Sequence, residues 1–189
     1  MIANETALPA YAYTTGWNEL TYRPVLREVW LTEDQAREQF EAAPSYFQVL
    51  DPIALNGEAP SFILEIRSAA TGRLASHRYN SAGSIMVKAD LRPENGRYFL
   101  DQVRSWTYPD AETRYSMSGS TSITTVTFEP DGTGTFTLKD KLEPANSMRL
   151  EARDIPVEDN WVDRFVFGDW DVLRNLKALE PTSSLLPPR

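Results

Sequence analysis

The fold is decided by residues 73–108, which read RLASHRYNSAGSIMVKADLRPENGRYFLDQVRSWTY. Three short runs in this stretch alternate in side-chain character, and turn-forming sequences at 80–83 and 92–96 separate them. Ile85, Val87 and Ala89, for example, are expected to share one face, because successive side chains of a strand point to opposite sides. Strand-like runs separated by Gly, Pro and Asn predict consecutive antiparallel strands.

The same pattern continues on both sides of this stretch and covers residues 61–167. Alternation at 62–66 predicts one more strand, and the Pro-Asp-Gly sequence at 130–132 predicts a hairpin turn. A long run at 113–129 is expected to form a strand bent at Gly119, and 161–167 to form another strand. About eight strands at this spacing predict an all-β fold, a mainly antiparallel meander wound into a closed or nearly closed β-barrel. The alternative is an α+β fold, with helices on the open face of a curved sheet.

The flanking regions complete a single expected domain of residues 1–189. Residues 1–18 show no regular period and are expected to form an arm, and 19–60 a strand, a helix and a loop. The helix should begin at the capping box 32–35 and end before Pro44. A second helix is expected over 169–180 and a Pro-rich tail over 181–189.

Composition excludes several classes of function. With 19 Lys and Arg against 27 Asp and Glu, the net charge is −8, which opposes a role in binding nucleic acid. The chain has no Cys and one His, so disulfides, thiolate chemistry and sites with two histidine ligands are excluded; we expect no metal and no cofactor. No apolar run reaches the roughly 18 residues of a membrane span, and no signal peptide is recognisable, so the expected location is the cytoplasm, away from membranes.

The candidate binding site lies on the middle strands, whose two faces are both mixed in polarity. Residues 73 and 77 are expected on one face of this run and residues 74 and 76 on the other, and neither face is plainly apolar. A barrel lumen would suit such a face, because small barrels can hold one ligand among polar and aromatic side chains. The candidate lumen residues are Arg73, His77, Tyr79, Phe99, Asp101 and Trp106.

The corresponding hypothesis is a barrel that binds an apolar or aromatic small molecule. It could also guide a cyclisation or an isomerisation by shape, because positioning alone can accelerate such a reaction. His77 would be the natural acid–base group, but no G-x-S-x-G motif accompanies it and no catalytic residue is assigned. The competing interpretation is that these strands are ordinary, half-exposed parts of a sheet.

The alternative function places an interaction surface in the C-terminal third. Residues 151–171 contain seven acidic residues against two arginines, together with several aromatic side chains. Such a surface could capture a basic protein, as an inhibitor or immunity-type module does, because complementary charge accelerates association and aromatic rings anchor it. Its candidate residues are Asp163, Asp169, Trp170 and Asp171. The competing interpretation is an acidic, solvated surface that favours solubility.

Overall fold

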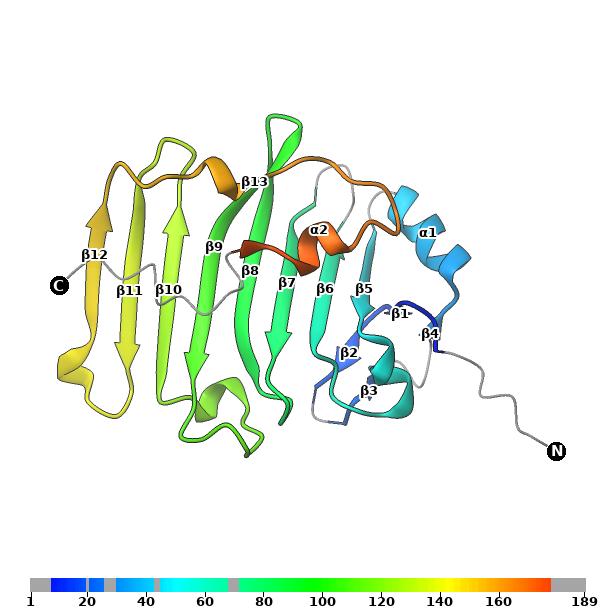
Figure 1. Ribbon diagram of the computed structural model, residues 1–189, viewed down its shortest axis with the longest axis horizontal. Helices are drawn as coiled ribbons and strands as arrows, with labels where there is room; N and C mark the ends of the chain where they lie inside the picture. Colours follow the sequence, from blue (N-terminus) through cyan, green and yellow to red (C-terminus); the bar gives the residue numbers. More distant parts are fainter. Residues whose placement is uncertain (1–7, 20, 26–29, 43–44, 68–71, 178–189) are drawn as a thin grey trace.

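The computed structural model describes residues 8–19, 21–25, 30–42, 45–67 and 72–177 of the chain. Within these ranges one sheet of eleven strands dominates the fold (Figure 1). Its strands are β1 (Ala12–Thr14), β4 (Trp30–Leu31), β5 (Tyr46–Leu50), β6 (Phe62–Arg67), β7 (Leu74–Tyr79), β8 (Ile85–Glu94), β9 (Arg97–Thr107), β10 (Ser122–Phe128), β11 (Gly134–Asp140), β12 (Met148–Ala152) and β13 (Trp161–Val162). The remaining elements are the hairpin of β2 (Trp17–Asn18) and β3 (Arg23–Pro24), the helices α1 (Glu33–Glu41) and α2 (Asp171–Arg174), and the 3-10 turns η1 (Pro52–Asn56), η2 (Met117–Gly119), η3 (Pro144–Asn146) and η4 (Glu158–Asn160).

The sheet is an antiparallel meander, as the alternation predicts, but the predicted barrel is wrong. Its strands follow the order β12-β11-β10-β9-β8-β7-β6-β5-β1-β4, and β13 pairs with one end of β9. The terminal strands β12 and β4 lie at opposite ends of the sheet and do not pair with each other, so the sheet stays open (Figure 1). Alternation could not reveal this, because the strands of open and closed sheets alternate in the same way.

Two predicted turns are confirmed and hold the central register. Asn95 and Gly96 join β8 to β9 with φ values of 48° and 81°, and positive φ at both central residues suits a type I′ hairpin. At the β10–β11 turn, the Glu129 N–H donates to the Thr133 carbonyl over 2.8 Å, and Gly132 has φ 79°. Residues with side chains rarely adopt such φ values, so glycine suits both turns.

A β-bulge at Asp101 changes which residues of β9 share a face. Leu91 pairs with Leu100 while Asp90 pairs with Gln102, so Asp101 is an extra residue in β9. The sequence alternation places Phe99 and Trp106 on opposite faces, but the bulge brings them to the same one. One inserted residue inverts the alternation of everything that follows it, so two positions seven residues apart share a face.

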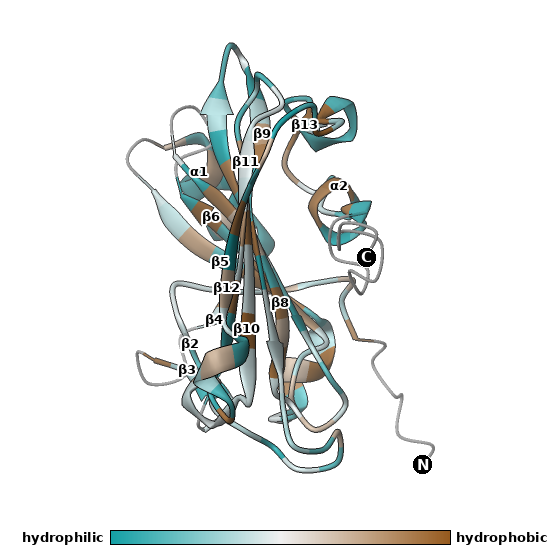
Figure 2. Cartoon of the chain, turned by 90° about the vertical axis from the view of Figure 1, so that its left-hand side faces the viewer, coloured by the Kyte–Doolittle hydropathy of each residue, from teal (hydrophilic) through white to brown (hydrophobic). Residues whose placement is uncertain are grey.

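The two faces of the sheet differ sharply in polarity. The front face carries apolar side chains at paired positions, for example Phe47, Ile66 and Leu74, all at most 1% exposed. The back face carries Glu65, His77, Lys88 and other polar residues in the central strands. Figure 2 shows the two sides: β13 and α2 lie on one, and the β2–β3 hairpin lies on the other.

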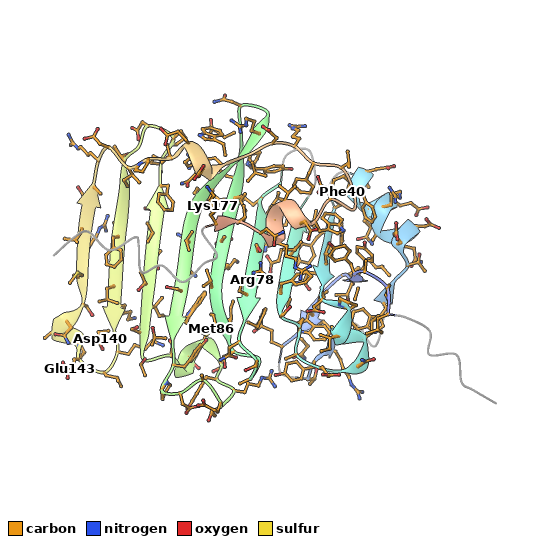
Figure 3. The ribbon with its side chains drawn as sticks, in the orientation of Figure 1. Phe40, Arg78, Met86, Asp140, Glu143 and Lys177 are labelled. Atoms are coloured by element: carbon orange, nitrogen blue, oxygen red, sulfur yellow. The ribbon has the colours of Figure 1, made fainter. Side chains whose placement is uncertain are left out.

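The chain's own C-terminal part covers the front face. After β13 it crosses β6 and β7 and forms α2, where Trp170 and Leu173 are fully buried in the main core. Arg78, on the front face, donates a hydrogen bond to the carbonyl of Arg174 at the end of α2 (Figure 3). Phe40 of α1 meets Trp170 at 5.8 Å between ring centroids, so α1 joins the same layer. These contacts supply the second layer that a closed barrel would have obtained from its opposite wall.

The capped helix is confirmed. Thr32 caps α1: its side chain accepts from the Gln35 N–H over 3.2 Å, and the Gln35 side chain accepts from the Thr32 N–H over 2.9 Å. The helix ends at Glu41, shortly before Pro44.

Other expected boundaries were wrong. Residues 12–14 and 17–18 are strands rather than an arm, because aromatic side chains there pack onto the sheet. The β10 strand begins at Ser122, and the residues before it, including η2, form no strand. Of 161–167 only Trp161 and Val162 pair, and of 169–177 only Asp171–Arg174 is α-helical. Residues 1–7 and the tail 181–189 lie outside the described ranges.

Candidate functional site

The six residues predicted to line a lumen lie on or beside the back face, at separate points. Phe99 packs on Trp161, with 4.8 Å between ring centroids, whereas Trp106, near the other end of β9, packs with Ile85 and Tyr108. Because the sheet is open, these residues enclose no barrel lumen. The structure brings together two subsets of them. His77 lies beside Tyr79, which packs against the cluster that contains Trp106, and Arg73 pairs with Asp101.

His77 is buried, with 7% of its surface exposed. Its Nδ1 lies 3.5 Å from the Tyr79 hydroxyl, which in turn donates to the Glu19 carboxylate over 2.6 Å. Its Nε2 is buried without a hydrogen-bond partner among the described residues and lies 3.7 Å from Glu65 Oε1. Burial, with a further contribution from Lys88, lowers the pKa of His77 to about 3, so the ring is neutral at neutral pH.

Tyr79 stays protonated for a related reason. Burial raises the pKa of its phenol far above the usual range, and the adjacent Glu19 carboxylate raises it further. The bond from the Tyr79 hydroxyl to Glu19 joins β7 to the β2–β3 region, and the neutral imidazole of His77 lies beside this hydroxyl. These groups therefore stabilise the packing of two parts of the chain.

The remaining charges of the back face compensate one another. Arg73 pairs with Asp101 over 3.0 Å, Arg92 with Glu129 over 2.9 Å and Lys88 with Asp90 over 3.3 Å. Burial raises the pKa of Asp101, and the two nearby arginines oppose this shift. No three His, Asp or Glu side chains within the described ranges gather in a way that could hold a metal ion. The arrangement is that of a balanced polar surface.

A pocket of about 420 Å³ lies elsewhere, at the β4 end of the sheet. It is lined by residues 9–13, residues 30–33, Leu55 and Gly168. The sheet register explains why it opens there. β1 and β4 pair only at Tyr13–Leu31 and Thr14–Trp30, and then the chain turns at Thr32 into α1. The segment 9–12 therefore has no strand beside it on that edge, and the gap between it and residues 32–33 remains open.

The aromatic walls of this pocket are fixed by contacts behind them. Tyr13 stacks on Phe167 with 5.7 Å between centroids, and its hydroxyl accepts a hydrogen bond from Trp170 Nε1 over 3.3 Å. Tyr11 donates to Asp171 over 3.3 Å, and Trp30 packs against Trp17. Because each ring is held by a second group, the walls are preformed, as is usual for small-molecule sites.

The pocket is mainly apolar, with few polar groups. Burial raises the pKa of both Tyr11 and Tyr13, so both phenols are neutral at neutral pH. The Glu33 side chain is 64% exposed and pairs with Arg37 over 3.1 Å. Such a site can hold an apolar or aromatic molecule by ring contacts.

The acidic residues proposed as a partner surface are largely engaged within the chain. Asp163 pairs with Arg97 over 2.7 Å, and Asp171 accepts from Tyr11 and lies 3.7 Å from Arg174. Asp169 is exposed. Trp170 is fully buried among aromatic rings of the core, so it is not available as a surface anchor.

Sequence reasoning missed the pocket because it assigned its first wall to an arm. A signal was present: small and aromatic residues alternate from Ala10 to Tyr13, which is a strand pattern with rings on one side. The approach of Gly168, from the far end of the chain, could not be read from any local pattern.

None of the helices in the described ranges combines the length and the apolar character needed to cross a bilayer. Comparison of the chain with protein-family models, with curated proteins and with solved structures finds no match.

Proposed function

We propose that this protein binds an apolar or aromatic small molecule in the pocket between residues 9–13 and the start of α1. The observation that carries the proposal is a cavity of about 420 Å³ with Tyr11, Tyr13 and Trp30 in its walls. Its volume lies within the range of about 300–1,000 Å³ that is typical of ligand sites. The proposal keeps the ligand class expected from the sequence and moves the site away from a barrel lumen.

The chemistry of the walls supports this ligand class. Flat rings contribute large contact areas, and a planar ligand can stack on them or meet their edges. The carboxylate nearest the pocket belongs to Glu33, whose charge Arg37 offsets, so the site offers no strong charge for an ionic ligand. Shape and ring contacts would therefore dominate the affinity.

Guidance of a cyclisation or an isomerisation would be a second step in the same pocket. Walls that are held by contacts behind them restrict the conformations of a bound molecule, which is how positioning lowers a barrier. We propose no general acid or base for such a step.

The binding proposal is tested with a pocket-filling substitution. Ala10 lines the pocket and is exposed, so Ala10→Phe should occupy the cavity without removing any core side chain. The probe is the neutral fluorophore N-phenyl-1-naphthylamine, whose emission rises in an apolar site. We expect saturable binding to the unmodified chain, and at least tenfold weaker binding to Ala10→Phe.

The matched control is Ala111→Phe, which adds the same ring at an exposed position outside the pocket. It should bind the probe as the unmodified chain does. Equal weakening by both substitutions, or binding that Ala10→Phe leaves unchanged, would overturn the proposal. Thermal unfolding of each variant shows whether lost binding merely reflects lost folding.

A further inference from the structure

The terminal strand β12 presents an open edge at the end of the sheet that is remote from the pocket. β11 pairs with one side of β12, and no described strand pairs with the other. All five residues of β12 are exposed, including Met148 at 48% and Leu150 at 41%. In Figure 3, Asp140 and Glu143 mark the turn that precedes this strand. Open edges of this kind are templates for pairing with another strand.

The hydrogen-bond pattern of the neighbouring hairpin shows which backbone groups of β12 point outward. Thr133 faces β10, because its carbonyl accepts from the Glu129 N–H over 2.8 Å. Backbone groups alternate between neighbours along an antiparallel strand, so Gly134, Phe136 and Leu138 face β12. Their partners on β12 are Ala152, Leu150 and Met148. The N–H and C=O groups of Arg149 and Glu151 therefore point to the open edge.

We propose that β12 pairs with β12 of a second copy of this chain, in an antiparallel register centred on Leu150. This register sets Arg149 opposite Glu151 of the other copy, and both residues carry outward backbone groups, so four backbone hydrogen bonds can form across the two-fold axis. Leu150 then faces Leu150, and Met148 faces Ala152, on the apolar side of the strand.

Charge complementarity selects this register over its neighbours. In it, the two Arg149–Glu151 pairs lie on the back face, where opposite charges at facing positions stabilise a sheet. Centring the pairing on Arg149 would place arginine opposite arginine. Centring it on Glu151 would place glutamate opposite glutamate and Arg149 opposite Arg153. Neither Arg149 nor Glu151 makes an ion pair within the described part of the chain, so both charges are available.

The short strand implies a weak, concentration-dependent dimer. Five residues on each side give a contact smaller than the roughly 1,200 Å² of stable interfaces, so we expect dissociation constants between about 10 µM and 1 mM. Sedimentation equilibrium of the full chain over that range should show a monomer–dimer equilibrium.

Charge substitutions test the register. Arg149→Glu places two pairs of glutamates opposite each other and should weaken the dimer at least tenfold. The exchange of both charges, Arg149→Glu with Glu151→Arg, restores the complementarity and should recover dimerisation. Failure of the exchanged variant to recover, while it remains folded, would overturn this register.

A cysteine pair gives an independent test, since the chain has no Cys of its own. In the proposed register the Cα atoms of the two Leu150 residues lie about 4.5 Å apart, which a disulfide can span. Oxidised glutathione should therefore link Leu150→Cys into a covalent dimer. Met148→Cys is the matched control, because it lies on the same face with similar exposure but its symmetry mate is too distant.

One combination of results would overturn the proposed dimer. A chain that remains monomeric at 1 mM, with Leu150→Cys and Met148→Cys linking equally slowly, would mean that the edge charges prevent pairing. The pocket experiment is unaffected by either result, because the pocket and β12 lie at opposite ends of the sheet.

Discussion

His77 illustrates how burial determines what a single residue can do. It is the one histidine of the chain, and sequence reasoning marks it as a possible acid–base group. In the structure it is neutral, with a pKa lowered to about 3, and it lies beside Tyr79, whose hydroxyl donates to Glu19. The folded chain therefore accommodates the neutral form of His77 and is destabilised when this ring is protonated.

The pH dependence of folding follows from this shift. The unfolded chain protonates His77 near pH 6.5, whereas the folded chain protonates it only near pH 3, so stability falls as the pH drops below 6.5. Between pH 7 and 5 we expect His77 to remove about 2 kcal/mol from the free energy of unfolding. Urea denaturation at both pH values measures this loss.

His77→Gln is the matched variant for that measurement. It should show a smaller loss between pH 7 and 5, because no other histidine is present and the surrounding Glu65, Lys88 and Asp90 are the same in both chains. If the two chains lose stability equally, His77 is not held neutral.

At the scale of elements, α1 owes its starting point to the capping box as much as to packing. Most residues of this helix are polar, and Ala36 is its only fully buried residue. Phe40 is partly buried against the aromatic cluster. A nine-residue helix is too short to be stable alone in water, so its caps and its few tertiary contacts decide whether it forms. Thr32 also lines the pocket, which links the helix start to the proposed site.

Removal of the cap should be measurable in the whole protein. We expect Thr32→Ala to lower the free energy of unfolding by about 1 kcal/mol, because the Gln35 N–H loses its acceptor. Thr32→Ser retains an acceptor and should stay within a few tenths of a kcal/mol of the unmodified chain. Chemical denaturation of the three chains gives the comparison; equal stability of all three would exclude a role for the cap.

At the scale of the whole molecule, the fold is a wide sheet whose apolar front is covered by the chain's own C-terminal part. The aromatic residues of 165–170 meet Phe40, Tyr13 and Phe47 there. Residues from the N-terminal and C-terminal parts of the described ranges therefore share one core, and the pocket lies where these parts meet.

A shortened chain tests the importance of this cover. A chain that ends at Asn160 should expose Phe47, Leu64 and Leu74, bind apolar dyes strongly and lose cooperative unfolding, because these side chains are at most 1% exposed when covered. In the full chain, Trp170→Ala with Leu173→Ala should shift unfolding in the same direction. Val166→Ala is the control, since Val166 is 74% exposed. A monomeric, cooperatively folded short chain would contradict this account.

The amino-acid sequence alone determined the local features of this protein. Alternation with period two specified the strands β6 to β9. Asn95-Gly96 specified the turn between β8 and β9, Gly132 the turn between β10 and β11, and the Thr32–Gln35 box the start of α1. Each of these depends on contacts between residues a few positions apart, so the pattern carries the information directly.

Only the tertiary structure decided that the sheet is open, that the bulge at Asp101 brings Phe99 and Trp106 to one face, and that Trp170 is buried. Each of these features depends on which segment, distant in the sequence, packs against a given surface of the sheet. The front face could have been covered by an opposite barrel wall or by the returning chain, and both satisfy the same alternation. The chain's aromatic C-terminal part covers it and brings Gly168 to the pocket between 9–13 and 30–33.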